Sequence, residues 1–424
     1  MSSSQALVRV GEPLDMYYTD HENAKKQAIP VEYDTRYSQA FSNPNQGVSV
    51  FTLPPNQGVR HVLIVLGYSA AQITSATAGG VGALERGWGY QAIQQISFRI
   101  GGSSQYFLSG SQLLARNLRL CRTKEQRNSI LSLGGQQVGG IPGSPTTATT
   151  TVQYAYIPVS IWAAPGEDEL GVPLPTDLLS QQVQVTCQLA PPSSYWLLNT
   201  TGSAPTLPTG FTTAYFQVEQ LQMKDRGMAL ANRINMNDHM YSMPLPTFDQ
   251  QEVVFSAQTQ ASTGGAYTLT GFRAGEVKKI QVWLAPAGSV TNASSQPNNL
   301  LWVKPAAAEI LYAGLKYSTY LDGSSAMWNL LDGTSPAAVD QSQLAISSTG
   351  WTSTSALSQW VELPFAQPTG SDYEADVLVH GKEITNGIVN LNITFPDGGT
   401  YDVHVVYIYN CTLGFSKGSA ELIF

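Results

Sequence analysis

The residues best suited to bind a metal ion or transfer a proton are five dispersed histidines: His21, His61, His239, His380 and His404. None stands at helical or hairpin spacing from another metal ligand. His404 alternates with Val403 and Val405 in a strand-like run, which predicts a strand residue with a hydrogen-bond partner. The chain also lacks the G-x-S-x-G, H-E-x-x-H and phosphate-loop motifs. The sequence therefore predicts no catalytic, metal-binding or cofactor-binding residue, and no enzyme activity.

The densest acidic cluster is Glu167-Asp168-Glu169. Paired carboxylates can hold Ca²⁺ or act as general acid and base. These three are adjacent on a loop rich in proline and glycine, so their side chains diverge and we expect a solvated loop. Gly79-Gly80-Val81-Gly82 is not followed by the helix and downstream acid that a nucleotide site needs, and it predicts a mobile loop.

Tyr195-Trp196 and Trp351 are the aromatic residues that could stack on a sugar ring. A carbohydrate-binding protein would use such a platform, together with a groove or a calcium loop. Because the signals for a groove and for a calcium loop are weak, we favour burial of these rings at an interface.

The surface of the folded chain is expected to carry few charges. Charged residues make up 12% of the 424 residues, against the usual ~25%. A weakly charged surface loses little hydration when it is buried against other subunits. The formal net charge of -8 argues against direct nucleic-acid binding, which depends on Lys and Arg neutralising phosphates.

The cysteines and the start of the chain bear on where the protein is made. Cys121, Cys187 and Cys411 are odd in number and far apart, and we expect Cys187 and Cys411 to be buried, reduced thiols. The polar start shows no signal peptide, and no apolar run reaches the ~20 residues that span a bilayer. We therefore expect synthesis and assembly in the cytoplasm.

Most of the chain consists of short apolar runs separated by glycine and proline, which predicts an all-β sandwich. The exception is Ser111–Leu133, where Leu114, Leu118 and Cys121 would line one face of a helix. Arginines (Arg116, Arg119 and Arg127) would line the opposite face. That stripe could contact nucleic acid, but a solvated face or an intersubunit salt-bridge surface suits the acidic chain better. A shorter helix is expected at Ala326–Leu331.

The second half of the chain repeats the first in order, at a separation of about two hundred residues. The matching pairs are Val48–Phe51 with Glu252–Phe255, Tyr106–Ser111 with Thr319–Ser324, Ile157–Val159 with Leu363–Phe365, and Val183–Leu189 with Val389–Phe395. So long a period predicts two copies of one domain rather than a solenoid, whose units span about 20–50 residues.

The repeat predicts four segments: an N-terminal arm (1–43), a first jelly roll (44–226), a linker (227–247) and a second jelly roll (248–424). In each half a turn, Ser109-Gly110 or Asp322-Gly323, is expected to join a strand to a helix. The leucines that precede these turns, Leu108 and Leu321, are expected to point into the two cores.

Two consecutive β-sandwiches with a helix in a long connection and no catalytic motif resemble the double jelly-roll major capsid proteins of tectivirus-like phages, adenoviruses and large DNA viruses. Ile157-Pro158-Val159 followed by Val172-Pro173-Leu174-Pro175 is similar to the strand–loop pattern of the large eukaryotic members, as is Leu363-Pro364-Phe365. The resemblance covers about residues 44–424 and implies two tandem eight-stranded jelly rolls.

The resemblance also implies a structural role. It implies a homotrimer that tiles the icosahedral capsid of a double-stranded DNA virus. The implied partners are neighbouring trimers, minor capsid and vertex proteins, and an internal membrane through the N-terminal arm. The alternative is a carbohydrate-binding tandem β-sandwich, such as a lectin-like spike or receptor-binding protein.

Overall fold

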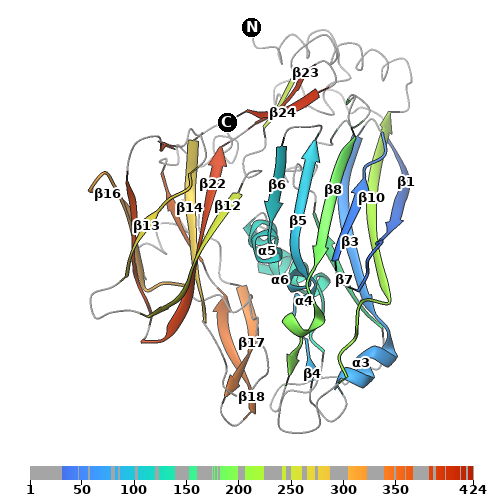
Figure 1. Cartoon of the computed structure of the whole chain (residues 1–424), viewed down its shortest axis with the longest axis horizontal. Helices are drawn as coiled ribbons and strands as arrows, with labels where there is room; N and C mark the ends of the chain where they lie inside the picture. The colour runs from blue at the N-terminus through green and yellow to red at the C-terminus, as the bar shows by residue number, and fades with distance from the viewer. Residues whose placement is uncertain are drawn as a thin grey trace.

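The structure is a computed structural model, and it describes the following residues: 31–45, 47–55, 58–77, 82–84, 86–100, 104–119, 124–138, 152–159, 174, 176, 179, 182–198, 206–223, 241–244, 250–259, 265–272, 276–286, 304–321, 339–347, 350–358, 360–365, 382–384, 388–396, 398–410, 412–416 and 419–423. Within them the chain forms two β-sandwiches that lie side by side (Figure 1). No helix in these ranges is long and apolar enough to cross a membrane.

The first sandwich consists of two four-stranded antiparallel sheets. One sheet has the order β1-β10-β3-β7 and the other β2-β8-β5-β6. The strands are β1 (Val31–Ala40), β2 (Gly47–Thr52), β3 (Gly58–Tyr68), β5 (Ile93–Ile100), β6 (Ser104–Leu108), β7 (Gln153–Pro158), β8 (Val183–Leu189) and β10 (Thr213–Met223).

The second sandwich has the same plan. Its sheets have the orders β12-β22-β14-β19 and β13-β21-β15-β16, and the short β20 (Lys382–Glu383) also pairs with β14. The strands are β12 (Gln250–Thr259), β13 (Gly265–Leu269), β14 (Glu276–Pro286), β15 (Ala307–Tyr312), β16 (Leu315–Leu321), β19 (Val361–Pro364), β21 (Val389–Thr394) and β22 (Thr400–Asn410).

The two halves have identical topology. Numbering the eight sandwich strands of each half in chain order, both have one sheet ordered 1-8-3-6 and a second ordered 2-7-4-5. This is the jelly-roll arrangement of two interlocked Greek keys. The predicted fold class, two tandem eight-stranded jelly rolls, is therefore confirmed.

Alternation along the strands places one face of each sheet in a core. In β8, the side chains of Val183, Val185, Cys187 and Leu189 are buried, and the residues between them are partly exposed. In β21, Val389, Leu391 and Ile393 are buried in the same way. Each core thus forms from the inward residues of two facing sheets. The burial of Cys187 is as expected, whereas Cys121 and Cys411 lie outside the described residues.

Within the described residues of the first half, every helix lies in a connection between strands. They are α3 (Ala70–Thr77), α4 (Trp88–Gln91), α5 (Gly110–Arg119), α6 (Lys124–Leu133) and the 3₁₀ turn Pro192–Ser194. The helix expected over 111–133 is therefore two helices, with residues 120–123 between them outside the described ranges. The helix expected at 326–331 and the turn Asp322-Gly323 are also outside them.

The arginine stripe expected on the 111–133 helix is wrong at Arg116, whose side chain is buried. The helical periodicity predicts an exposed Arg116 because it assumes that only one face of the helix is covered. In the structure every side chain from Gln112 to Leu118 is buried, so α5 is covered on more than one side. The side chains of Arg119 and Arg127 are not described.

The segment expected to be an arm contributes a strand of the first jelly roll. Strand β1 pairs antiparallel with β10 from Val31 to Ala40, so this jelly roll begins before residue 44. As an edge strand, β1 can carry charged residues such as Glu32 and Asp34, which hid its strand character. The predicted match of Glu252–Phe255 with Val48–Phe51 is therefore wrong. Glu252–Phe255 lies in β12, which is the counterpart of β1, whereas Val48–Phe51 lies in β2.

Three smaller sheets complete the described structure. Part of the expected linker forms β11 (Tyr241–Pro244), which joins β23 (Thr412–Ser416) and β24 (Ser419–Ile423) in a three-stranded sheet. The strands β17 (Val339–Ser347) and β18 (Gly350–Ser358) form a hairpin, and β4 (Gly82–Ala83) pairs with β9 (Leu197–Leu198).

Two of the other repeat matches are confirmed, and one is shifted by a residue. Ile157–Val159 and Leu363–Phe365 end the equivalent strands β7 and β19, and Val183–Leu189 and Val389–Phe395 match β8 and β21. In β6 the core residue is Leu108, but in β16 it is Tyr320, because Tyr320 pairs with the buried Ala308. The side chain of Leu321 is not described.

Candidate functional site: the joint between the two jelly rolls

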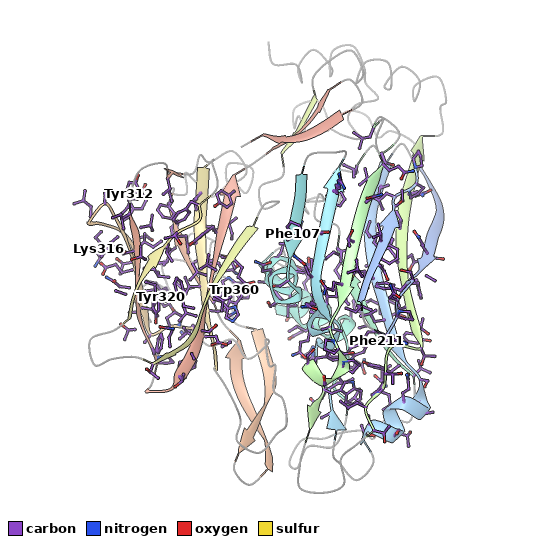
Figure 2. The ribbon with its side chains drawn as sticks, viewed as in Figure 1. Phe107, Phe211, Tyr312, Lys316, Tyr320 and Trp360 are labelled. Carbon is purple, nitrogen blue, oxygen red and sulfur yellow. The ribbon has the colours of Figure 1, made fainter. Side chains whose placement is uncertain are left out.

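The sheet β12-β22-β14-β19 of the second jelly roll is buried on both faces. Its inward residues, such as Val282, Val405 and Leu363, form the core of the second jelly roll. Its outward residues Trp283, Trp360, Val406 and Ile408 belong instead to the core cluster of the first jelly roll. The two halves therefore share one continuous apolar contact (Figure 2).

Two tryptophans form the apolar centre of this joint. Trp283 is fully buried, and its ring stacks on that of His404 with centroids 5.3 Å apart and planes 8° apart. Trp360 projects from the second jelly roll toward the first (Figure 2) and is 4% exposed. Large buried aromatic rings are the side chains that contribute most to the energy of such contacts.

A buried ion pair lies beside Trp360. The indole Nε1 of Trp360 donates a hydrogen bond to Oε1 of Glu362 at 3.1 Å. The other oxygen, Oε2, accepts from Nζ of Lys279 at 2.8 Å. Both oxygens of a carboxylate that is almost fully buried thus have partners, which offsets its loss of hydration.

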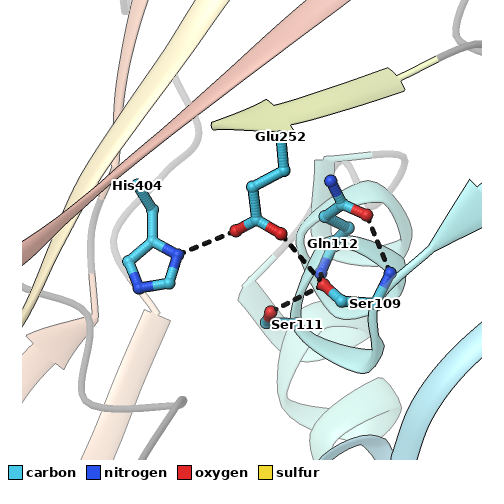
Figure 3. A network of polar contacts seen from close by, with 5 residues as sticks. All are labelled: Ser109, Ser111, Gln112, Glu252 and His404. Atoms are coloured by element: carbon cyan, nitrogen blue, oxygen red, sulfur yellow. Dashed lines mark hydrogen bonds and ion pairs between the residues drawn. The ribbon is translucent and has the colours of Figure 1, made fainter. Parts of the chain in front are cut away.

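Glu252 links the two jelly rolls directly (Figure 3). Its Oε1 lies 2.7 Å from Nδ1 of His404 within the second jelly roll. Its Oε2 accepts a hydrogen bond from Oγ of Ser109 in the first jelly roll at 3.3 Å. The side chains of Glu252 and His404 are 15% and 13% exposed, so this bridge is shielded from solvent.

Ser109 is held in place because it caps helix α5. The Gln112 backbone N–H donates to Oγ of Ser109 at 3.2 Å, and the Ser109 N–H donates to Oε1 of Gln112 at 2.7 Å. This reciprocal pair is a capping box, and a carboxylate near a helix N-terminus is favoured by the helix dipole. The helix thereby presents its N-terminus to Glu252.

Helix α5 is fixed on its other side by the first jelly roll. Nδ2 of Asn117 donates to Oη of Tyr90 at 3.1 Å and to the carbonyl of Pro158 at 3.0 Å. Leu114 and Leu118 are buried in the first core. Figure 1 shows α5 and α6 on the side of the first jelly roll that faces the second. The helices therefore act as a spacer between the two sandwiches.

The absence of a catalytic or metal-binding constellation stays a prediction, and only the described residues can be compared with it. Among the described residues, no group of three His, Cys, Asp or Glu side chains could hold a metal ion. His404 has the partner expected of it, and Nε2 of His61 lies 3.7 Å from Oε2 of Glu219. Glu167-Asp168-Glu169 and the first three residues of Gly79-Gly80-Val81-Gly82 lie outside the described ranges, while Gly82 is in β4.

Tyr195 and Trp196 do not form a sugar-stacking platform. Both are fully buried in the first core, where the hydroxyls of Tyr195 and Tyr68 hydrogen-bond to each other. Nε1 of Trp196 donates to Oη of Tyr68 at 3.4 Å. Burial raises the pKa of the Tyr68 and Tyr195 hydroxyls. They are buried inside one jelly roll, whereas we expected burial at an interface. The side chain of Trp351 is not described.

The sequence analysis did not identify Trp283, Trp360 or Glu252 as residues of a contact between the two jelly rolls. A signal was present, because Val282-Trp283-Leu284 and Val403–Tyr409 are nearly continuous apolar runs in an otherwise alternating chain. Such runs indicate strands buried on both faces.

The same fold occurs in solved virus structures. PBCV-1 VP54, fitted into a reconstruction of the virophage Sputnik, gives a TM-score of 0.62 at 13% identity, over 94% of this chain and 98% of that one. The Faustovirus major capsid protein gives 0.55 at 8% identity, over 94% of each chain. The Sputnik virophage structure gives 0.54 at 13% identity, over 93% of this chain and 88% of that one. Identities this low show a shared fold only.

Comparison at the level of sequence adds no relative. No protein-family model matches the chain, and no curated protein matches it.

Proposed function

We propose that this chain is a major capsid protein whose homotrimers, with six jelly rolls each, tile the icosahedral shell of a double-stranded DNA virus. The observation that carries the proposal is the fold similarity to VP54 and to the Faustovirus major capsid protein over 94% of this chain, which includes both jelly rolls. The protein would be located in the virion, after synthesis and assembly in the host cytoplasm. Neighbouring trimers, minor capsid proteins and vertex proteins would be its partners.

The described side chains suit a structural role. The hydrogen bonds of Glu252 join the two halves of the chain, and the Glu362–Lys279 pair lies within the second jelly roll; both carboxylates are shielded from solvent. The similar solved chains are capsid proteins, so we infer no enzyme activity. The net charge of -8 does not suit direct nucleic-acid binding. A lectin-like role is not favoured, because the Tyr195-Trp196 pair is buried.

We also propose that the segment before β1 packs beneath the shell, against neighbouring trimers or an internal membrane. Because β1 belongs to the first sheet, the informative deletion removes residues 1–30 and leaves Val31 in place. Such a deletion should preserve trimers and block shell assembly. Loss of trimers would contradict this role.

The oligomeric state tests the main proposal. Light scattering of the purified protein at micromolar concentration should give the mass of three chains, and negative-stain images should show hexagonal plates. A stable monomer at that concentration would contradict the proposal.

A further inference from the structure

The ion pair beside Trp360 brings together two groups that can react with each other. Lys279 of β14 and Glu362 of β19 lie on adjacent antiparallel strands. In the register, Lys279 is opposite Pro364, two residues beyond Glu362, so the lysine side chain reaches its partner diagonally across the strands. The Lys279 and Glu362 side chains are 14% and 4% exposed. A primary amine and a carboxyl group are thus held together away from water.

The jelly-roll fold does not itself require an amine and a carboxylate at these positions. Burial removes the hydration of both charges, and apolar side chains of similar size are often as stabilising as a buried ion pair. The first jelly roll has Leu63 at the position of Lys279, opposite the proline that ends the strand. It has Tyr156 at the position of Glu362, two residues before that proline. The pair is therefore a feature of the second jelly roll and not of the fold.

The contact has a geometry from which an amide can form. Nζ of Lys279 lies 2.8 Å from Oε2 of Glu362. The nitrogen is therefore near Cδ of the same carboxyl group, close to the separation of about 3–3.5 Å at which bound reactants attack. Trp360 holds the other oxygen, because its Nε1 donates to Oε1 at 3.1 Å. A hydrogen-bond donor thus fixes one carboxyl oxygen while a nucleophile lies beside the other.

We propose that Lys279 and Glu362 condense into an isopeptide bond in the folded protein. One ammonium proton passes to Oε2 along the existing hydrogen bond, and the neutral Nζ attacks Cδ. As the Nζ–Cδ bond forms, negative charge develops on Oε1, and the indole N–H of Trp360 stabilises that charge. Oε2 then leaves as water with two of the three ammonium protons, and Oε1 becomes the amide carbonyl oxygen. The balance needs no oxidant, reductant or co-reactant.

The joint between the jelly rolls supplies the surroundings that this reaction needs. Trp360 belongs to the core cluster of the first jelly roll and projects toward that domain (Figure 2), so packing of the two domains covers the reacting groups. Exclusion of water strengthens the hydrogen bond from the indole to the developing charge and prevents side reactions. Condensation therefore follows folding of both domains. It is a single event within one chain and adds no enzyme activity.

The bond fastens a short strand to its sheet. β19 has four residues and lies at one end of the order β12-β22-β14-β19. The cross-link also closes the chain between Lys279 and Glu362 into a loop that contains β15, β16, β17 and β18. Closing a long loop lowers the conformational entropy of the unfolded chain. Trp360, two residues before Glu362, is thereby kept at the joint.

Mass spectrometry of the full chain, unfolded after purification, tests the proposal. The protein should be lighter than its sequence by one water molecule. Trypsin should fail to cleave after Lys279 and should release a branched peptide that contains Glu362. Lys316 is the matched control, because its Nζ lies 2.7 Å from Oε1 of Glu309 but its side chain is 61% exposed. Trypsin should cleave after Lys316. Cleavage after Lys279, with no branched peptide, would overturn the proposal.

Two variants separate condensation from a stable ion pair. Lys279→Arg keeps the positive charge and the hydrogen bonds, but a guanidinium does not attack a carboxyl group, so the missing water should be restored. The same mass deficit in Lys279→Arg would place the lost water elsewhere and overturn the proposal. Trp360→Phe keeps an aromatic ring at the joint and removes the N–H, so a smaller fraction of chains should be cross-linked. An unchanged fraction would contradict the role given to the indole. These masses are measured on unfolded chains, so the outcome is independent of the oligomeric state and of the capsid proposal.

Discussion

Glu252 and His404 are 152 residues apart in sequence, yet Oε1 of the first lies 2.7 Å from Nδ1 of the second. They lie on the paired strands β12 and β22, next to the stacked ring of Trp283. The carboxylate has a second bond, to Ser109 of the other jelly roll. Glu252 therefore couples the register of one sheet to the position of a helix in the neighbouring domain.

Replacing Glu252 by alanine should lower the free energy of unfolding by about 1–3 kcal/mol, the usual cost of leaving buried polar partners unsatisfied. His404 and Ser109 would each lose a hydrogen bond in a place that solvent reaches poorly. Urea unfolding monitored by tryptophan fluorescence measures the change.

The matched control for Glu252 is Glu309→Ala. Glu309 pairs with Lys316 at 2.7 Å, but the Lys316 side chain is 61% exposed. Surface ion pairs contribute about 0–1 kcal/mol, so this variant should unfold almost as the unsubstituted protein does. Equal losses from the two substitutions would contradict a structural role for the Glu252 bridge.

Trp283→Ala should be more severe, because it removes a fully buried tryptophan from the centre of the joint. Truncation of a buried tryptophan costs about 3–5 kcal/mol. The loss falls between the two jelly rolls, so we expect a single calorimetric transition to separate into two. Val50→Ala, on an exposed position of β2, should leave the transition unchanged. A single transition with an unshifted midpoint would show that Trp283 does not couple the domains.

Much of the fold could be predicted because the strands that face one core keep strict alternation. Val183–Leu189 and Val389–Phe395 are such strands, and the match between them is correct. The match failed at β12, the counterpart of β1, because the charged residues of the edge strand β1 hid its strand character. It slipped by one residue at Leu108, since a short motif cannot fix the register that the Ala308–Tyr320 pair sets.

The corrected register changes which residues should matter in the two cores. Leu108→Ala and Tyr320→Ala remove equivalent core side chains and should each cost about 2–5 kcal/mol, as buried large-to-small substitutions do. Phe107→Ala is the control in the first half, because Phe107 is 42% exposed although it adjoins Leu108. Thermal unfolding of the three variants checks the order. A loss at Phe107 as large as at Leu108 would show that the alternation of β6 is misassigned.

Cys187 should be unreactive in the folded protein. The thiol is fully buried, and burial raises its pKa far above the ordinary value, so little thiolate forms. Labelling with a maleimide, followed by peptide mass mapping, should leave Cys187 unmodified even at pH 9 and modify it in urea. Modification at pH 9 without unfolding would mean that solvent reaches this strand.

The joint itself could not be predicted from spacing, because its residues come from strands far apart in the chain. The pattern around His404 predicts a partner but cannot identify Glu252, since the pairing of β12 with β22 depends on the fold. Arg116 was misplaced for a related reason. A helix between two domains is covered on several sides, so one apolar stripe no longer separates the core from solvent.

The turn before α5 offers a last test, because it requires a glycine for reasons of space. A Cβ atom on Gly110 would lie 2.6 Å from the carbonyl oxygen of Ile93 and even closer to that of Tyr90. Both are backbone atoms and cannot move without displacing α4 or β5. Gly110→Ala should therefore destabilise the protein by about 1–3 kcal/mol, the usual cost of overpacking. It should also weaken the Ser109–Glu252 hydrogen bond by shifting the N-terminus of α5.

Gly398→Ala is the control for Gly110→Ala, because a Cβ atom at Gly398 meets nothing within 4 Å. Chemical unfolding of both variants should show a loss at Gly110 only; equal stability would mean that the helix can move away from Tyr90 at little cost.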